Sequence, residues 1–123
     1  MADNRVDDFK ELIVWKRAME LAKAAYALTK LLPREEDYAL SDQIRRSAVS
    51  IPSNIAEGYG RTTTKEYARF LSMARRSGYE LETQLLLCID LEYIDENEAA
   101  LALRLNKEVS KMLTAIITKI GNG

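Results

Sequence analysis

The sequence predicts an all-α protein, an antiparallel up-down-up-down four-helix bundle that forms one domain over residues 1–123. Apolar residues recur at alternating spacings of three and four along four segments, as they do on one face of a helix. The last two links between these segments span about three to five residues, which favours antiparallel neighbours. Only 5 Gly and 2 Pro are present, too few for the many turns of an all-β fold.

The first helix is predicted over roughly residues 8–32, with Asp7 or Asp8 as its N-cap and Pro33 marking its end. It carries two neighbouring apolar rows. The first row is Val14, Ala18, Leu21, Ala25, Leu28 and Leu32, and the second is Trp15, Met19, Ala22 and Tyr26. Such a wide apolar face indicates more than one packing neighbour, and we therefore expect the protein to form oligomers.

The second helix is predicted over residues 42–59, opened by Ser41 or Asp42 and ended by Gly58 and Gly60. Its apolar row is Ile44, Ala48, Ile51 and Ile55. Pro52 lies inside this helix, where it removes one backbone hydrogen bond and clashes with the carbonyl of Ala48. We therefore expect a kink near Pro52.

The third and fourth helices, predicted over residues 64–91 and 96–120, both follow capping patterns. Thr63 stands three residues before Glu66, and Asp95 three before Glu98, spacings at which the two side chains satisfy free N–H groups at the helix start. Long apolar rows follow each cap. They are Tyr67, Leu71, Ala74, Gly78, Leu81, Leu85 and Cys88, then Ala102, Leu105, Val109, Met112, Ile116 and Ile120.

The composition excludes several classes of function. The chain has no His, which removes the commonest general base and the Glu-x-x-His motifs of di-iron bundles. Cys88 is the single cysteine and continues an apolar row, so we interpret it as a small buried side chain and not a nucleophile. We expect a non-enzymatic protein with no metal and no cofactor.

Membrane insertion and secretion are also disfavoured. No segment approaches the roughly 18 uninterrupted apolar residues of a membrane helix. The polar, acidic stretch from Met1 to Asp8 lacks the apolar core of a signal peptide. A cytoplasmic location is the resulting expectation.

Basic charge is concentrated in the centre of the chain. Residues 43–78 hold seven basic and two acidic residues, a net +5, whereas the whole chain has a net charge of −1. The seven are Arg45, Arg46, Arg61, Lys65, Arg69, Arg75 and Arg76. One interpretation is a nucleic-acid-binding surface at the joined end of helices two and three, since guanidinium groups suit phosphate contacts. The other is a solvated or subunit-contacting surface with local ion pairs.

A polar row also follows the second helix at spacings of four and three. Its members are Gln43, Ser47, Ser50, Asn54 and Glu57, and Arg61 continues it. Small hydroxyls and an amide are unusual on a merely solvated face, which favours Glu and Lys. The row indicates either a polar groove or close helix packing in which the serines bond to nearby backbone.

The run from Gln43 to Gly58, which contains Ser-Ile-Pro-Ser-Asn-Ile-Ala-Glu-Gly, resembles the signature of the 23S rRNA intervening-sequence protein family. Four further stretches match the family pattern: Leu12–Ala18, Gly60–Arg61, Tyr67–Leu71 and Glu80–Gln84. The resemblance covers about Phe9 to Ile120. Arg76-Ser77-Gly78, where the family usually has Gly-Ser-Leu, and Ser47, where Ala is common, depart from the pattern.

The resemblance implies a four-helix bundle that assembles into a homopentamer, and it supplies no catalytic residues. Some members are encoded within insertions in bacterial ribosomal RNA genes. A distant relative is the accessory protein of diversity-generating retroelements, which contacts reverse transcriptase and nucleic acid. We therefore expect RNA or DNA, or a protein partner such as a reverse transcriptase, as the binding partner. The alternative function is a scaffold for an acidic protein partner, without a role in nucleic-acid binding.

Overall fold

The computed structural model describes residues 8–121, and all regular structure in this part of the chain is helical. Four long helices are present: α1 (Ile13–Thr29), α2 (Leu40–Tyr59), α3 (Thr64–Asp90) and α4 (Glu96–Gly121). Two short 3₁₀ helices, η1 (Phe9–Glu11) and η2 (Arg34–Glu36), precede α1 and α2. The predicted all-α class is confirmed.

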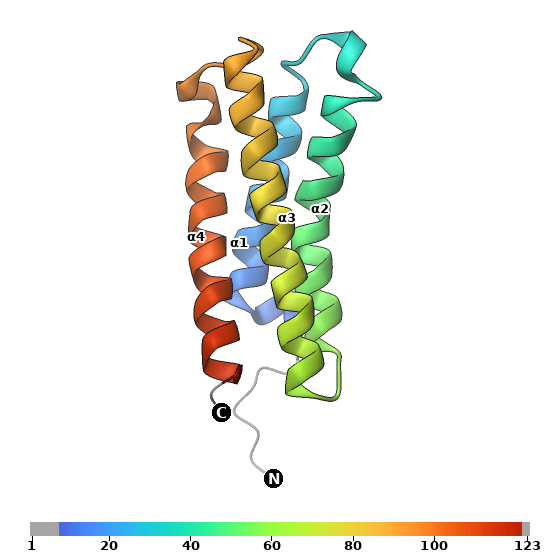
Figure 1. Ribbon diagram of the computed structural model, residues 1–123, viewed down its shortest axis with the longest axis vertical. Helices are drawn as coiled ribbons and strands as arrows, with labels where there is room; N and C mark the ends of the chain where they lie inside the picture. The colour runs from blue at the N-terminus through green and yellow to red at the C-terminus, as the bar shows by residue number, and fades with distance from the viewer. Residues whose placement is uncertain (1–7, 122–123) are drawn as a thin grey trace.

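The four helices pack side by side as an elongated bundle in which consecutive helices run in opposite directions (Figure 1). The connections α1–α2 and α3–α4 lie at the upper end of this view, and the α2–α3 turn lies at the lower end with the start of α1 and the end of α4. Each helix therefore contacts the next one along the chain, and α4 closes the bundle against α1.

The predicted first helix is too long at both ends. Asp8 accepts a hydrogen bond from the backbone N of Lys10 at 3.0 Å, so it caps η1 and not α1. Leu12 occupies the N-cap of α1 without a side-chain hydrogen bond, and Asp7 lies outside the described residues. At the other end α1 stops at Thr29, and bonds from Leu31 and Leu32 to carbonyls three residues earlier tighten the chain into a turn.

The second helix begins at Leu40, two residues earlier than predicted. Ala39 is its N-cap, and the carboxylate of Glu36 accepts a hydrogen bond from Leu40 N at 3.3 Å. Ser41 and Asp42 therefore lie within the first turn and do not open the helix. Pro52 lies inside an uninterrupted α2, and a kink there stays a prediction. The helix ends at Tyr59 with Gly60 as C-cap, whereas Gly58 belongs to the helix.

The caps of α3 and α4 form as the sequence predicts. The hydroxyl of Thr63 accepts a hydrogen bond from Glu66 N at 3.1 Å. At α4, Asp95 and Glu98 satisfy each other's backbone N–H groups at 2.9 and 2.7 Å. The observed bounds of these two helices differ from the prediction by one residue at the C-terminal ends.

The predicted apolar rows meet in one hydrophobic core along the bundle axis. The largest side chains removed completely from solvent are Leu21, Ile44, Ile51, Ile55, Leu71, Leu81 and Leu85. The second apolar row of α1 differs, because Met19 and Tyr26 remain 41% and 42% exposed. Among the described residues no helix is both long and apolar enough to cross a membrane.

Candidate nucleic-acid interface

The seven basic residues of the central segment do not form one cluster. Arg45 and Arg46 lie near the start of α2, at the upper end of the bundle, whereas Arg61 follows its lower end. Arg61 follows Arg45 by sixteen positions, most of them in α2, which corresponds to about 24 Å along the axis. The charge that is contiguous in sequence is therefore distributed over the length of the molecule (Figure 1).

Three of these arginines hold carboxylates of their own helix or turn. Arg46 pairs with Asp42 at 2.8 Å, Arg61 with Glu57 at 2.7 Å and Arg69 with Glu66 at 4.0 Å. Arg45 instead donates a hydrogen bond to the backbone carbonyl of Asp37 at 2.9 Å. The ion pairs are exposed and contribute little to stability, but they reduce the positive potential around Arg46, Arg61 and Arg69.

An aromatic ring organises the basic residues at the lower end. The guanidinium carbons of Arg61 and Arg69 lie 4.7 and 5.1 Å from the centroid of the Phe70 ring. Phe70 is 7% exposed, so the ring provides a fixed surface for both cations. Lys65 lies in the first turn of α3 between these two arginines in sequence, is exposed, and has no ion pair within residues 8–121.

Arg75 and Arg76 face different neighbours of α3. Arg75 donates a hydrogen bond from Nη1 to the hydroxyl of Thr114 on α4 at 3.1 Å. Arg76 instead lines a surface hollow beside α2 with Ser50 and Glu80 and has no ion pair in the described part of the chain. Adjacent arginines in sequence therefore serve two different seams of the bundle.

The polar row of α2 divides into packing and exposed members. Ser50 Oγ and Ser77 Oγ of α3 share a hydrogen bond of 2.8 Å. Asn54 Nδ2 donates to the carbonyl of Ser50 at 2.8 Å and to its hydroxyl at 2.9 Å. Ser47 is buried, while Gln43 and Glu57 are exposed. The middle of the row thus joins α2 to α3 with satisfied hydrogen bonds, which supports the close-packing interpretation of its middle.

The lower and upper halves of the bundle differ in net charge. The lower half, residues 8–21, 51–76 and 108–121, holds ten basic and six acidic residues, a net +4. The upper half, residues 22–50 and 77–107, holds seven basic and eleven acidic residues, a net −4. Lys111 and Lys119 of α4 add to the basic half, and the sequence-based assignment missed them because they belong to a segment with net charge −4. Aligning the four helices in antiparallel order would have found them.

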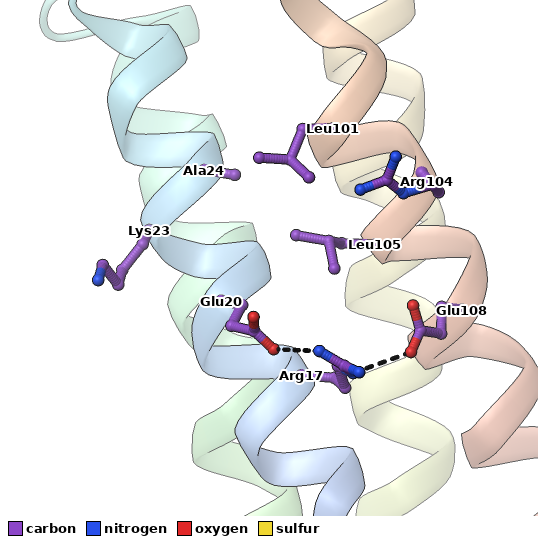
Figure 2. A pocket seen from close by; sticks show the side chains of 8 residues that line it. All are labelled: Arg17, Glu20, Lys23, Ala24, Leu101, Arg104, Leu105 and Glu108. Carbon is purple, nitrogen blue, oxygen red and sulfur yellow. Dashed lines mark hydrogen bonds and ion pairs between the residues drawn. The ribbon is translucent and has the colours of Figure 1, made fainter.

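In a second surface hollow, between α1 and α4, one arginine is paired with two carboxylates (Figure 2). Arg17 of α1 contacts Glu20 at 2.8 Å through Nη1 and Glu108 of α4 at 2.9 Å through Nε. The hydrogen bond to Glu20 and the charge of Glu108 raise the pKa of Arg17. Lys23 points away from the hollow (Figure 2). This arrangement ties α1 to α4 and leaves no free cation for a ligand at Arg17.

Cys88 is fully buried, as predicted from its place in the apolar row. Burial, with a smaller contribution from the charge of Glu36, raises the pKa of its thiol to about 11. A thiol with this pKa is protonated at neutral pH and is a poor nucleophile. Within residues 8–121, no three His, Cys, Asp or Glu side chains gather in a way that suits a metal ion.

The fold and the surface define a class of small antiparallel four-helix bundles with a basic lower half and an acidic upper half. The 23S rRNA-intervening sequence protein family matches residues 10–115, and the chain belongs to this family. No curated protein matches the chain.

A similar solved structure is the crystal structure of a protein with unknown function from the S23 ribosomal protein family of Bacteroides thetaiotaomicron. The two chains are 29% identical, with a TM-score of 0.79. The similarity covers 85% of this chain and 98% of the other.

Proposed function

We propose that this protein is a non-enzymatic, oligomeric helical bundle that acts as an accessory protein associated with RNA or DNA. The observation that carries the proposal is the net +4 of the lower half, set against the net −4 of the upper half. A nucleic acid carries one phosphate charge per nucleotide, so it would approach the protein from the lower end. The family name, which refers to 23S rRNA, agrees with this chemistry.

The residues expected to contact phosphates are the exposed basic residues at the lower end of the bundle. Arg61 and Arg69 are fixed against Phe70 and keep part of each guanidinium in solvent. Lys65 adds a charge without an ion pair in the described part of the chain. A phosphate would compete with Glu57 and Glu66 for the arginines, which predicts weak binding at high salt.

Fluorescence anisotropy with a structured RNA and with a DNA duplex, over a series of salt concentrations, tests the proposal. We expect binding at low salt. The logarithm of the association constant should fall linearly with the logarithm of the salt concentration. The triple variant Arg61→Gln, Lys65→Gln and Arg69→Gln should weaken binding strongly. Its matched control, Lys23→Gln, Lys30→Gln and Arg34→Gln, removes three charges from the acidic half and should bind like the wild type. Absence of binding at micromolar protein and low salt would reject the proposal.

Self-association is the second part of the proposal. Met19 and Tyr26 leave the second apolar row of α1 partly exposed, and Leu86, Leu87, Leu91 and Leu101 are each between 45% and 49% exposed. Contact between copies would bury these side chains. The resemblance to the family suggests five copies. Light scattering should give a mass near five times 14.0 kDa, and a monomer mass would contradict self-association.

A protein scaffold for an acidic partner is the second candidate function. It is favoured by the three arginines that already hold carboxylates, because a carboxylate from a partner such as a reverse transcriptase would fit the same groups. A pull-down before and after nuclease treatment distinguishes the two candidates. A partner that stays bound after nuclease treatment supports the scaffold, and one that is lost supports the nucleic-acid function.

A further inference from the structure

We propose that the groove between α3 and α4 is a phosphate-binding site in which Lys107 and Lys111 supply the positive charge. The proposal rests on the proposed function for its natural ligand, a backbone phosphate of RNA or DNA. The site itself is argued from the geometry of the groove. It would therefore also bind a phosphate group that is not part of a nucleic acid, such as that of a free nucleotide.

The groove is hollowed where small and polar groups of α3 and α4 meet. Its cavity volume is about 330 Å³. Gly78 of α3 has no side chain, and its carbonyl accepts a hydrogen bond from Asn106 Nδ2 of α4 at 2.8 Å. A Cβ on Gly78 would lie 3.0 Å from Asn106 Oδ1, so the glycine leaves room for this amide. Asn106 is 5% exposed, and the pair forms a fixed polar floor.

The two lysines stand on one face of α4 beside this floor. Lys107 and Lys111 are four residues apart, so their side chains lie one above the other along the groove. Both are exposed, and neither has an ion pair within residues 8–121. Two like charges at this spacing destabilise a helix, and a bound anion would remove that repulsion.

The remaining side chains of the groove suit a tetrahedral oxyanion. Tyr79 and Ser110 line the hollow and carry hydroxyl groups that can donate to phosphate oxygens. Lysine ammonium groups bind phosphate as point charges. Glu82 is the acidic member of the lining, and it leaves the groove with a net charge of +1.

Arg75 extends the positive charge along the same seam. It lies three residues before Gly78, and its partner Thr114 lies three residues after Lys111, so both continue the groove by one helical turn. Thr114 is neutral, so this hydrogen bond leaves the charge of Arg75 uncompensated. With Arg75 the seam has a net charge of +2. Arg75 therefore differs from Arg46, Arg61 and Arg69, each of which is paired with a carboxylate.

The test uses the full chain and two probes, inorganic phosphate and a fluorescent single-stranded RNA. Phosphate is titrated into the ¹⁵N-labelled protein, and we expect the amide resonances of Gly78, Ser110 and Lys111 to shift in the wild type. The variant Lys107→Gln, Lys111→Gln should lose these shifts. For RNA, the same variant should reduce the slope of log affinity against log salt by about 1 for each lost contact.

The matched control is Lys23→Gln, Lys30→Gln, which removes the same two charges from exposed positions on α1 and its C-cap. Glutamine is a good helix former, so both variants should keep the thermal midpoint of the wild type. The control should keep the phosphate shifts and the salt slope. Phosphate shifts in the wild type itself provide a readout that needs no variant.

The outcomes separate the site from the proposed function. RNA binding that weakens equally in both variants, without phosphate shifts in the groove, overturns the site and leaves the proposed function standing. Phosphate shifts that depend on the two lysines, without RNA binding, support the site with a free phosphate group as its ligand and reject the proposed function. Absence of both signals overturns both.

Discussion

The charged side chains at the two ends of the bundle make different kinds of contact. At the upper end the carboxylate of Glu36 accepts hydrogen bonds from the Tyr93 hydroxyl at 2.8 Å and from Leu40 N at 3.3 Å. This one acidic group thereby joins the α1–α2 connection to the α3–α4 connection. At the lower end Arg61 and Arg69 both lie against the ring of Phe70 and remain partly exposed to solvent.

The difference shows which charges are available to a partner. Glu36 is half-buried and its two oxygens are engaged, so the upper end uses this charge to hold its own loops. The lower end places its cations on a rigid aromatic support and pairs them only with exposed carboxylates, which an incoming anion can displace. Net charge counted along the sequence does not make this distinction, whereas the contacts do.

The largest predicted effect tests how tightly the lower end is packed. A Cβ on Gly58 would lie 2.6 Å from the Cβ of Phe70, an atom fixed to the α3 backbone. Gly58→Ala should therefore push α2 away from α3 and destabilise the protein by about 2 to 3 kcal/mol, which exceeds the helix-propensity gain of about 1 kcal/mol. Urea denaturation at a fixed protein concentration measures the free energy of unfolding.

Gly60→Ala is the matched control for this substitution. Gly60 is the C-cap of α2, and a Cβ there would lie 3.6 Å from the carbonyl of Glu57, an ordinary contact. We expect its free energy of unfolding to stay within about 0.5 kcal/mol of the wild type. Equal effects of the two alanines would show that the close contact between Gly58 and Phe70 does not limit the packing of α2 on α3.

The next effect belongs to the upper end and depends on pH. Burial raises the pKa of Cys88 from its ordinary value of 9.0 to about 11 in the folded protein. The folded state holds the thiol proton more tightly than the unfolded state, so this stabilisation is complete below pH 9 and is lost as pH rises through 11. The loss should be on the order of 2 kcal/mol at pH 11.

Cys88→Ala isolates this contribution, because lysines and tyrosines titrate over the same pH range in both proteins. Alanine leaves a cavity and lowers stability at every pH, but it has no proton to lose. The difference in unfolding free energy between wild type and Cys88→Ala should therefore shrink between pH 9 and pH 11. A difference that stays constant over this range would contradict a buried, protonated thiol.

The fold was predictable to the extent that it depends on periodic apolar rows and local caps. The rows containing Ile44 and Leu81 are buried, and the caps at Thr63 and Asp95 form. The ends of α1 were not predictable, because a 3₁₀ helix takes Asp8 as its cap and the chain turns already after Thr29. The start of α2 depends on Glu36, whose carboxylate bonds Leu40 N in place of a local N-cap residue.

The candidate site was less predictable than the fold. The sequence shows seven basic residues in one segment, but the length of α2 separates Arg45 from Arg61 and the helical rotation of α3 separates Arg75 from Arg76. Lys111 joins the basic half only through the antiparallel return of α4. Charge along the chain becomes a surface only after the register between helices is known, and one sequence does not contain that register explicitly.

The smallest predicted effect compares a supported arginine with an unsupported one. Arg61, with a side chain 39% exposed, contacts both Glu57 and the Phe70 ring, whereas Arg46, 79% exposed, contacts Asp42 alone. Arg61→Gln should cost about 1 kcal/mol, since a cation–π contact adds roughly 0.5 to 1 kcal/mol to a weak surface ion pair. Arg46→Gln should cost less than about 0.5 kcal/mol.

A double-mutant cycle with Phe70→Leu separates the two contributions to Arg61, because leucine keeps an apolar side chain but removes the ring face. If the ring supports the cation, the cost of Arg61→Gln should fall by at least about half in the Phe70→Leu background. High salt should reduce only the part that comes from Glu57 and leave this coupling in place. A coupling of zero would mean that the Phe70 ring does not stabilise the Arg61 side chain. The contrast between the two ends would then depend, for Arg61, on its carboxylate partner alone.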